Sequence, residues 1–161
     1  MCEETANYLW AEKDVLGRGA TSQVYKAYNK TTGELVAAKV YPVASGLRSQ
    51  YGANPNSRER DFRRILDREM DILKDTKHEN IVRYIGVEPV TYSDAVIAPG
   101  TREALFIEYC NGGSLNNVLE LFENRYGLMD DEFMIVFKHL TNALRYLRDK
   151  NTVRNTKRKL S

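Results

Sequence analysis

Two glycines and a lysine are the first residues in the chain whose types and spacing suit the binding of a ligand. Gly17 and Gly19 lie between two strand-like runs, and Lys39 follows in the next run, residues 36–40. Because glycine has no Cβ, the backbone at these positions can approach a ligand closely. Its N–H groups can then face phosphate oxygens, and a lysine from a neighbouring strand adds a point charge. The pattern predicts a site for nucleotide phosphates, with a plain glycine hairpin as the alternative.

Three strands are expected to position these residues. Residues 8–16 lead into the glycine turn and residues 23–28 leave it; residues 35–41 follow a hairpin turn at 29–34 that is rich in turn-forming residues. Period-two alternation places Ala37 and Lys39 on one face of the last strand. Sheet core is the alternative interpretation of Ala37.

A helix is expected over residues 57–75, with Ser57 as its N-cap. Glu69 lies on the apolar stripe of this helix, and a carboxylate that faces the core is costly unless it is paired. Lys39 is the obvious partner. Two alternatives stay open: Glu69 reaches solvent at the edge of the stripe, or Glu59 is the partner.

Later elements follow the same rules. Residues 81–87 and 104–110 read as two further strands, residues 115–123 as a short helix capped by Ser114, and residues 130–150 as a long amphipathic helix.

The quoted segments resemble the opening of the IKK-related serine/threonine protein kinases, the TANK-binding kinase and IKK-epsilon type. The similarity rests on N-Y-L-W at 7–10, L-G-R-G-A-T at 16–21 and V-A-A-K at 36–39. It implies an α+β fold: a protein-kinase-like small lobe over residues 8–110, with a five-stranded antiparallel sheet and helix C. The hinge and the first two large-lobe helices, D and E, would occupy 111–150, before a basic, disordered tail at 151–161.

The resemblance also implies roles for individual residues. Lys39 and Glu69 would be catalytic, Ile107 the gatekeeper, and the backbone of Glu108 and Cys110 the contact with the adenine edge. The implied cofactor is ATP, with Mg²⁺ only in a complete kinase domain and no metal ligand in this chain. The full set of expected nucleotide contacts is Leu16, Gly17, Arg18, Gly19, Ala20, Thr21, Ser22, Val24, Ala37, Lys39, Ile107, Glu108, Tyr109 and Cys110.

The 161 residues contain neither H-R-D nor D-F-G, the motifs that hold the catalytic base and metal ligands of kinases. We therefore expect negligible phosphoryl transfer from this chain alone. The leading function is the ATP-binding portion of a kinase that phosphorylates protein Ser/Thr, and the alternative is an inactive truncated kinase-like regulator that acts through protein–protein interaction. A third interpretation, an unrelated nucleotide-binding module, would make the lysine, the glutamate and the hinge a coincidence. The implied partners are protein substrates, adaptor proteins or a full-length relative in innate-immune signalling.

The composition limits the partners and the cellular compartment that we expect for this protein. A net charge of +2 gives no reason to expect nucleic acid or an anionic membrane as a partner. The two cysteines, Cys2 and Cys110, lack metal-type spacing and suit a reducing compartment. No run is apolar enough to cross a bilayer and the N-terminus does not resemble a signal peptide, so we expect a cytoplasmic protein.

Overall fold

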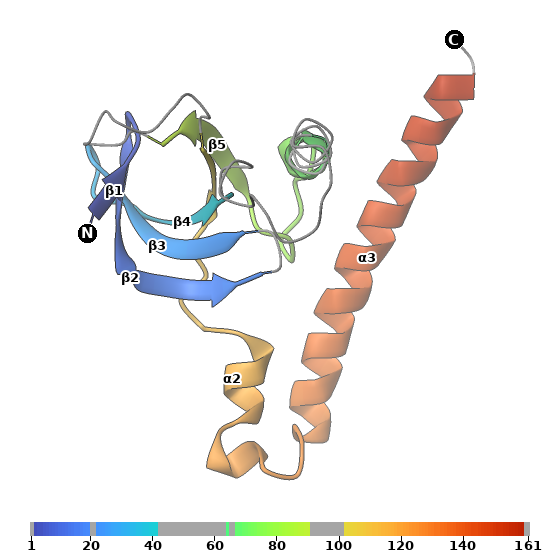
Figure 1. Ribbon diagram of the computed structural model, residues 1–161. Coiled ribbons are helices and arrows are strands. Elements are labelled where there is room, and N and C mark those ends of the chain that lie inside the picture. The colour runs from blue at the N-terminus through green and yellow to red at the C-terminus, as the bar shows by residue number, and fades with distance from the viewer. Residues whose placement is uncertain (1, 20–21, 42–63, 65–66, 91–101, 160–161) are drawn as a thin grey trace, which may run out of the picture. The chain divides into compact units, whose positions relative to one another are not determined.

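The computed structural model describes residues 2–19, 22–41, 64, 67–90 and 102–159 (Figure 1). The chain divides into two compact units, one of residues 1–76 and 83–109, the other of residues 77–82 and 110–161. The expected cap Ser57 and the rival partner Glu59 lie outside the described residues. Residues 42–56, whose composition predicts a surface insertion, lie outside them as well. Among the described residues, no helix has the length and apolar character needed to span a membrane.

The first unit is built on one antiparallel sheet with strand order β1-β2-β3-β4-β6-β5. Residues 67–74 are helical and belong to the same unit. The strands are β1 (Cys2–Glu4), β2 (Tyr8–Arg18), β3 (Gln23–Asn29), β4 (Leu35–Val40), β5 (Tyr84–Pro89) and β6 (Glu103–Glu108).

The sheet has six strands rather than the expected five. The extra strand is β1, which pairs with β2 through Glu3 opposite Trp10. A turn held by Thr5 reverses the chain: its N–H donates to the carbonyl of Tyr8 over 2.9 Å, and its hydroxyl accepts from the N–H of Tyr8 over 3.1 Å. This turn contains neither glycine nor proline, which hid it from sequence reasoning.

Several strand bounds also differ from expectation. β5 begins at Tyr84 rather than at residue 81, because the N–H of Ile81 still closes a turn onto the carbonyl of His78 over 3.1 Å. β6 ends at Glu108 rather than at residue 110. The hairpin turn at 29–34 forms as predicted, with the N–H of Gly33 bonded to the carbonyl of Asn29 over 2.8 Å and Gly33 at φ 72°.

One face of the sheet forms the main core. Trp10, Ala27, Val36, Ala38 and Phe106 are almost fully buried there, and the ring of Phe106 stacks on that of Tyr8 at 3.9 Å between centroids. The alternation expected for residues 36–40 is confirmed, because Val36, Ala38 and Val40 belong to this core cluster and Ala37 and Lys39 do not.

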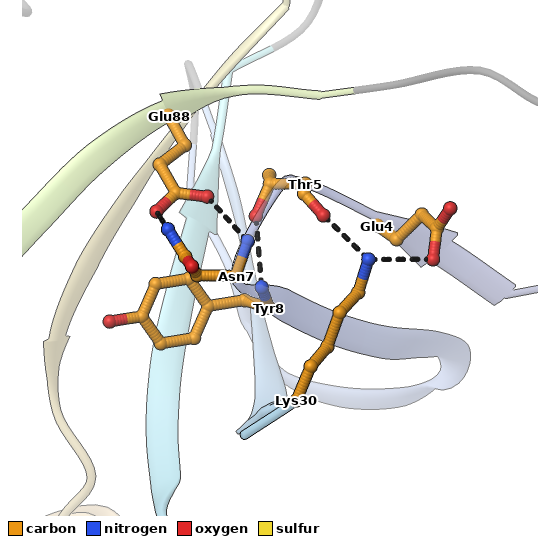
Figure 2. Close-up of polar contacts among 6 residues, drawn as sticks. All are labelled: Glu4, Thr5, Asn7, Tyr8, Lys30 and Glu88. Atoms are coloured by element: carbon orange, nitrogen blue, oxygen red, sulfur yellow. Dashed lines mark hydrogen bonds and ion pairs between the residues drawn. The ribbon is translucent and has the colours of Figure 1, made fainter. Parts of the chain in front are cut away.

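Polar side chains join the two edges of the curled sheet (Figure 2). The backbone N–H and side-chain amide of Asn7, in the β1–β2 turn, donate to the two carboxylate oxygens of Glu88 on β5 over 3.0 and 2.7 Å. Lys30 donates to the carbonyl of Thr5 over 2.7 Å and pairs with Glu4 over 2.8 Å. These contacts fix the N-terminal segment against the sheet that carries Lys39.

The second unit contains α2 (Leu115–Leu119), a 3₁₀ turn η2 (Phe122–Asn124) and α3 (Asp130–Lys159). Ser114 caps α2 as predicted, in a reciprocal capping box with Asn117. Segment 77–82 is held to α3, because the N–H of Lys77 donates to the hydroxyl of Tyr146 over 3.0 Å.

Two helix ends differ from expectation. The helix expected over 115–123 is interrupted after Leu119 and continues as the 3₁₀ turn. α3 runs to Lys159, so the expected helix end at Lys150 is wrong and the backbone of the expected tail is helical through residue 159. No glycine or proline follows Gly127, so the two strongest helix-stopping residues are absent from this part of the sequence.

Candidate nucleotide-binding site

An ion pair between sheet and helix marks the centre of the candidate site. Lys39 on β4 places its Nζ 2.6 Å from Oε1 of Glu69, which lies in the helical residues 67–74. The two side chains are 24% and 31% exposed, so the pair is shielded from bulk water and still reachable by a ligand. This is the partnership that alternation and the helix stripe predicted; the catalytic roles of both residues remain predictions.

The strand register brings four expected contact residues onto one face of the sheet. Val24 on β3 lies directly opposite Lys39 on β4, and Ala37 on β4 lies directly opposite Ile107 on β6. Directly opposed residues of antiparallel strands project to the same side. Lys39 and Ala37 are two residues apart and therefore share that side too. The lysine thus stands at the end of a small apolar surface made by Val24, Ala37 and Ile107.

The glycine segment is more regular than expected. β2 continues to Arg18, with Gly17 opposite Val24 and Arg18 opposite Gln23, so the strand does not stop at Leu16. Beyond the strand, the N–H of Gly19 donates to the carbonyl of Ser22 over 2.8 Å. Ala20 and Thr21 lie outside the described residues. An added Cβ at Gly17 would meet no atom within 4 Å, so there is open space beside the backbone at this position.

The end of β6 is fixed by contacts with Arg83. The N–H of Glu108 donates to the carbonyl of Arg83 over 2.9 Å, and the carboxylate of Glu108 accepts from the N–H of Arg83 over 3.1 Å. The ring of Tyr109 lies 5.6 Å from the ammonium of Lys26. Cys110, an exposed free thiol, belongs to the second unit. The expected base contacts through Glu108 and Cys110 remain predictions.

Tyr41 is a member of the site that sequence reasoning missed. Its hydroxyl donates to Oε2 of Glu69 over 2.7 Å, while Lys39 contacts Oε1 of the same carboxylate. Burial raises the pKa of Tyr41 well above its usual value, and the hydrogen bond and charge of Glu69 raise it further. The phenol is therefore a proton donor throughout the physiological range. Its position two residues after Lys39, on the same side of the chain, was the available signal.

The donor set fits an adenine nucleotide. A lysine ammonium carries three donors, and the contact with Glu69 uses one of them, which leaves donors for phosphate oxygens. Small apolar side chains at positions 24 and 37 suit a flat aromatic base. Among the described residues there is no cluster of three His, Cys, Asp or Glu that could hold a metal ion.

Comparisons with known proteins agree with this geometry. The protein kinase domain family matches residues 10–155. The Mus musculus inhibitor of nuclear factor kappa-B kinase subunit epsilon is 38% identical over 151 residues, which cover 94% of this chain and 18% of that protein. The subunit beta from Bos taurus is 30% identical over 144 residues, covering 89% of this chain and 17% of that protein. The chain therefore spans less than one fifth of the length of either relative.

A solved structure has the same fold. The structure of Rad53 1–466 in complex with AMP-PNP superposes with a TM-score of 0.63 at 21% identity, covering 90% of this chain and 31% of that one. The expected α+β kinase fold and the resemblance to IKK-related kinases are thus confirmed.

Proposed function

Because the chain belongs to the protein kinase domain family, we propose that it is the ATP-binding portion of a serine/threonine protein kinase of the IKK-related type. In the complete enzyme this portion would hold ATP while its γ-phosphoryl group passes to a serine or threonine of a protein substrate. The observation that carries the proposal is the contact between Lys39 and Glu69, 2.6 Å long and closed to bulk water on most of its surface.

Each side chain of the site has a role in this proposal. Glu69 orients the ammonium of Lys39, which then neutralises phosphate charge on the nucleotide. Val24 and Ala37 cover the base, and the glycines at 17 and 19 let the backbone approach the phosphates. Phosphoryl transfer is chiefly positioning and charge neutralisation, and these residues would supply the part of it that concerns the nucleotide.

The cofactors and partners of the proposal follow from the family. ATP is the nucleotide, Mg²⁺ accompanies it in a complete kinase domain, and the partners are protein substrates or adaptors. A role in innate-immune signalling is supported by the similarity to IKK-epsilon. A cytoplasmic location is part of the same proposal, and it is supported by two cysteines that are both free thiols.

Calorimetric titration of ATP into the 161-residue chain tests the proposal. We expect saturable binding that Lys39→Met weakens at least about tenfold, because a charge-assisted contact with phosphate is lost. Lys13→Met is the matched control, since it removes the same charge from an exposed position on β2 of the same sheet. Binding that is absent, or equally affected by both variants, would overturn the proposal.

A second function is supported by the surface of α3. Phe133, Phe137, Leu140 and Leu144 are each more than half exposed, and exposed apolar groups of this extent commonly mark protein contacts. The chain would then act as a kinase-like regulator through protein–protein interaction. Co-purification with a full-length relative, lost on Phe137→Asp and retained in Lys39→Met, would favour this function over ATP binding.

A further inference from the structure

The carboxylate of Glu69 is held by two side chains rather than one. Its Oε1 contacts the ammonium of Lys39 over 2.6 Å, and its Oε2 accepts from the hydroxyl of Tyr41 over 2.7 Å. Lys39 lies on β4 and Tyr41 is the first residue after that strand, so both partners of Glu69 come from one short segment of the chain. Lys39, Tyr41 and Glu69 thus form a hydrogen-bonded group of three side chains that joins the helical segment to the sheet.

The surroundings of Tyr41 hold its side chain in the position that contacts Glu69. Its side chain is 3% exposed and lies in a cluster with Leu105, against which Met70 and Leu73 of the helical segment also pack. The backbone N–H of Tyr41 bonds to the carbonyl of Glu103 over 3.3 Å, which anchors the residue beside β6. Apolar packing has little directional preference, whereas a hydrogen bond to one carboxylate oxygen fixes the orientation of the Glu69 side chain.

The geometry also limits how Lys39 binds Glu69. A carboxylate offers two oxygens, and an ammonium that engaged both would present fewer donors elsewhere. In the structure Tyr41 donates to Oε2 and Lys39 donates to Oε1, so the contact with Glu69 uses one donor of the ammonium and leaves the others available. The ammonium also lies 5.5 Å from the centroid of the Tyr41 ring, so the same residue borders the lysine on a second side.

We propose that Tyr41 is a positioning residue for the nucleotide site. Its hydroxyl holds Glu69 in the orientation that pairs with Lys39 through one oxygen and thereby keeps the lysine ready for phosphate. Its effect on ATP binding rests on the function proposed above, whereas its effect on the helical segment 67–74 does not. The two effects can therefore be measured separately.

Tyr41→Phe tests the proposal, because it removes the hydroxyl and keeps the ring that fills the cluster. Tyr8→Phe is the matched control, since Tyr8 is also buried but belongs to the other core cluster. Each variant is made in the 161-residue chain, in the wild-type background and in Glu69→Leu, which removes every acceptor of that side chain. Two quantities are measured: amide hydrogen exchange of residues 67–74 without nucleotide, and the dissociation constant for ATP.

We expect Tyr41→Phe to speed exchange in residues 67–74 about tenfold and to weaken ATP binding about threefold to tenfold, as loss of a hydrogen bond to a charged group implies. In Glu69→Leu the same change should have a much smaller effect on both, and Tyr8→Phe should leave both unchanged. A role in packing alone would give equal effects in the two backgrounds, and that result would overturn the proposal.

The outcomes separate the two proposals. If the wild-type chain binds no ATP, the proposed function fails, and faster exchange in Tyr41→Phe that depends on Glu69 still supports the positioning role for the helix. If ATP binds and Tyr41→Phe changes neither exchange nor affinity, the positioning role is wrong and the proposed function stands.

Discussion

Replacing Lys39 by Met and Glu69 by Gln, singly and together, measures how strongly the two side chains interact in solution. The difference between the double variant and the sum of the single variants is the coupling free energy. The pair has a short contact of 2.6 Å and side-chain exposures of 24% and 31%, which place it between the exposed and buried classes.

The magnitude follows from that position. Exposed pairs are worth about 0.2–1 kcal/mol, and breaking a buried pair costs about 3–5 kcal/mol. We therefore expect a coupling of about 1–2 kcal/mol for Lys39 and Glu69. With a urea m-value of about 1–3 kcal/mol per M for a small protein, that coupling corresponds to a midpoint shift of roughly 0.3–2 M.

The assay is urea unfolding followed by tryptophan fluorescence. The chain has one tryptophan, Trp10, which is 1% exposed in the core of the first unit, so the signal reports on the unit that holds the pair. Arg83 and Glu34 supply the control cycle, because they are 3.9 Å apart and 67% and 63% exposed. A coupling for Lys39 and Glu69 no larger than that of the control would show that the pair is not a stable feature in solution.

Three further predictions concern the surrounding structure. Glu88→Gln should lower the free energy of unfolding at neutral pH, and the difference from wild type should shrink as pH falls below 4.5. Burial alone would raise the pKa of Glu88, but hydrogen bonds from Thr5 and Asn7 hold it below its usual value. The ionised carboxylate therefore stabilises the folded state, and this stabilisation is lost when the carboxylate is protonated. Urea titrations at several pH values check this, and a constant difference would contradict it. Gly33→Ala should cost about 1 kcal/mol by the tryptophan assay because Gly33 has φ 72°; an unchanged midpoint would refute the turn geometry. Ser114→Ala should cost α2 about 1 kcal/mol through loss of its N-cap, seen as faster amide exchange over Leu115–Leu119, and unaltered exchange there would argue against the cap.

The sequence contained enough to predict the partnership of Lys39 and Glu69, because two independent periodicities point to it. Alternation along β4 sets the side of the sheet from which Lys39 projects, and the apolar stripe of the helix sets the direction of Glu69. The hairpin before β4 was predictable for a local reason, since Gly33 takes a positive φ that other residues avoid.

Features that depend on distant contacts were not predictable in this way. β1 has only three residues, too few for alternation to mark a strand, and the bond from the N–H of Tyr8 to the hydroxyl of Thr5 that supports its turn is a feature of the folded chain. Tyr41 reads as an ordinary apolar residue at a strand end, and its hydrogen bond appears only once the helix that carries Glu69 is in place. The end of α3 was misjudged because a basic, polar composition was taken for disorder, although nothing in it breaks a helix.

The most direct test of the account asks whether Lys39 lies at the phosphates of bound ATP. An acyl phosphate derivative of ATP transfers its acyl group to a nearby lysine amine: the amine nitrogen forms an amide, the bond from the acyl carbon to the phosphate oxygen breaks, and ATP leaves. The modified lysines of the 161-residue chain are then located by mass spectrometry, with and without excess ATP. We expect Lys39 to be the principal site and ATP to protect it. Modification of Lys39 no greater than that of the exposed Lys13, or unaffected by ATP, would contradict it.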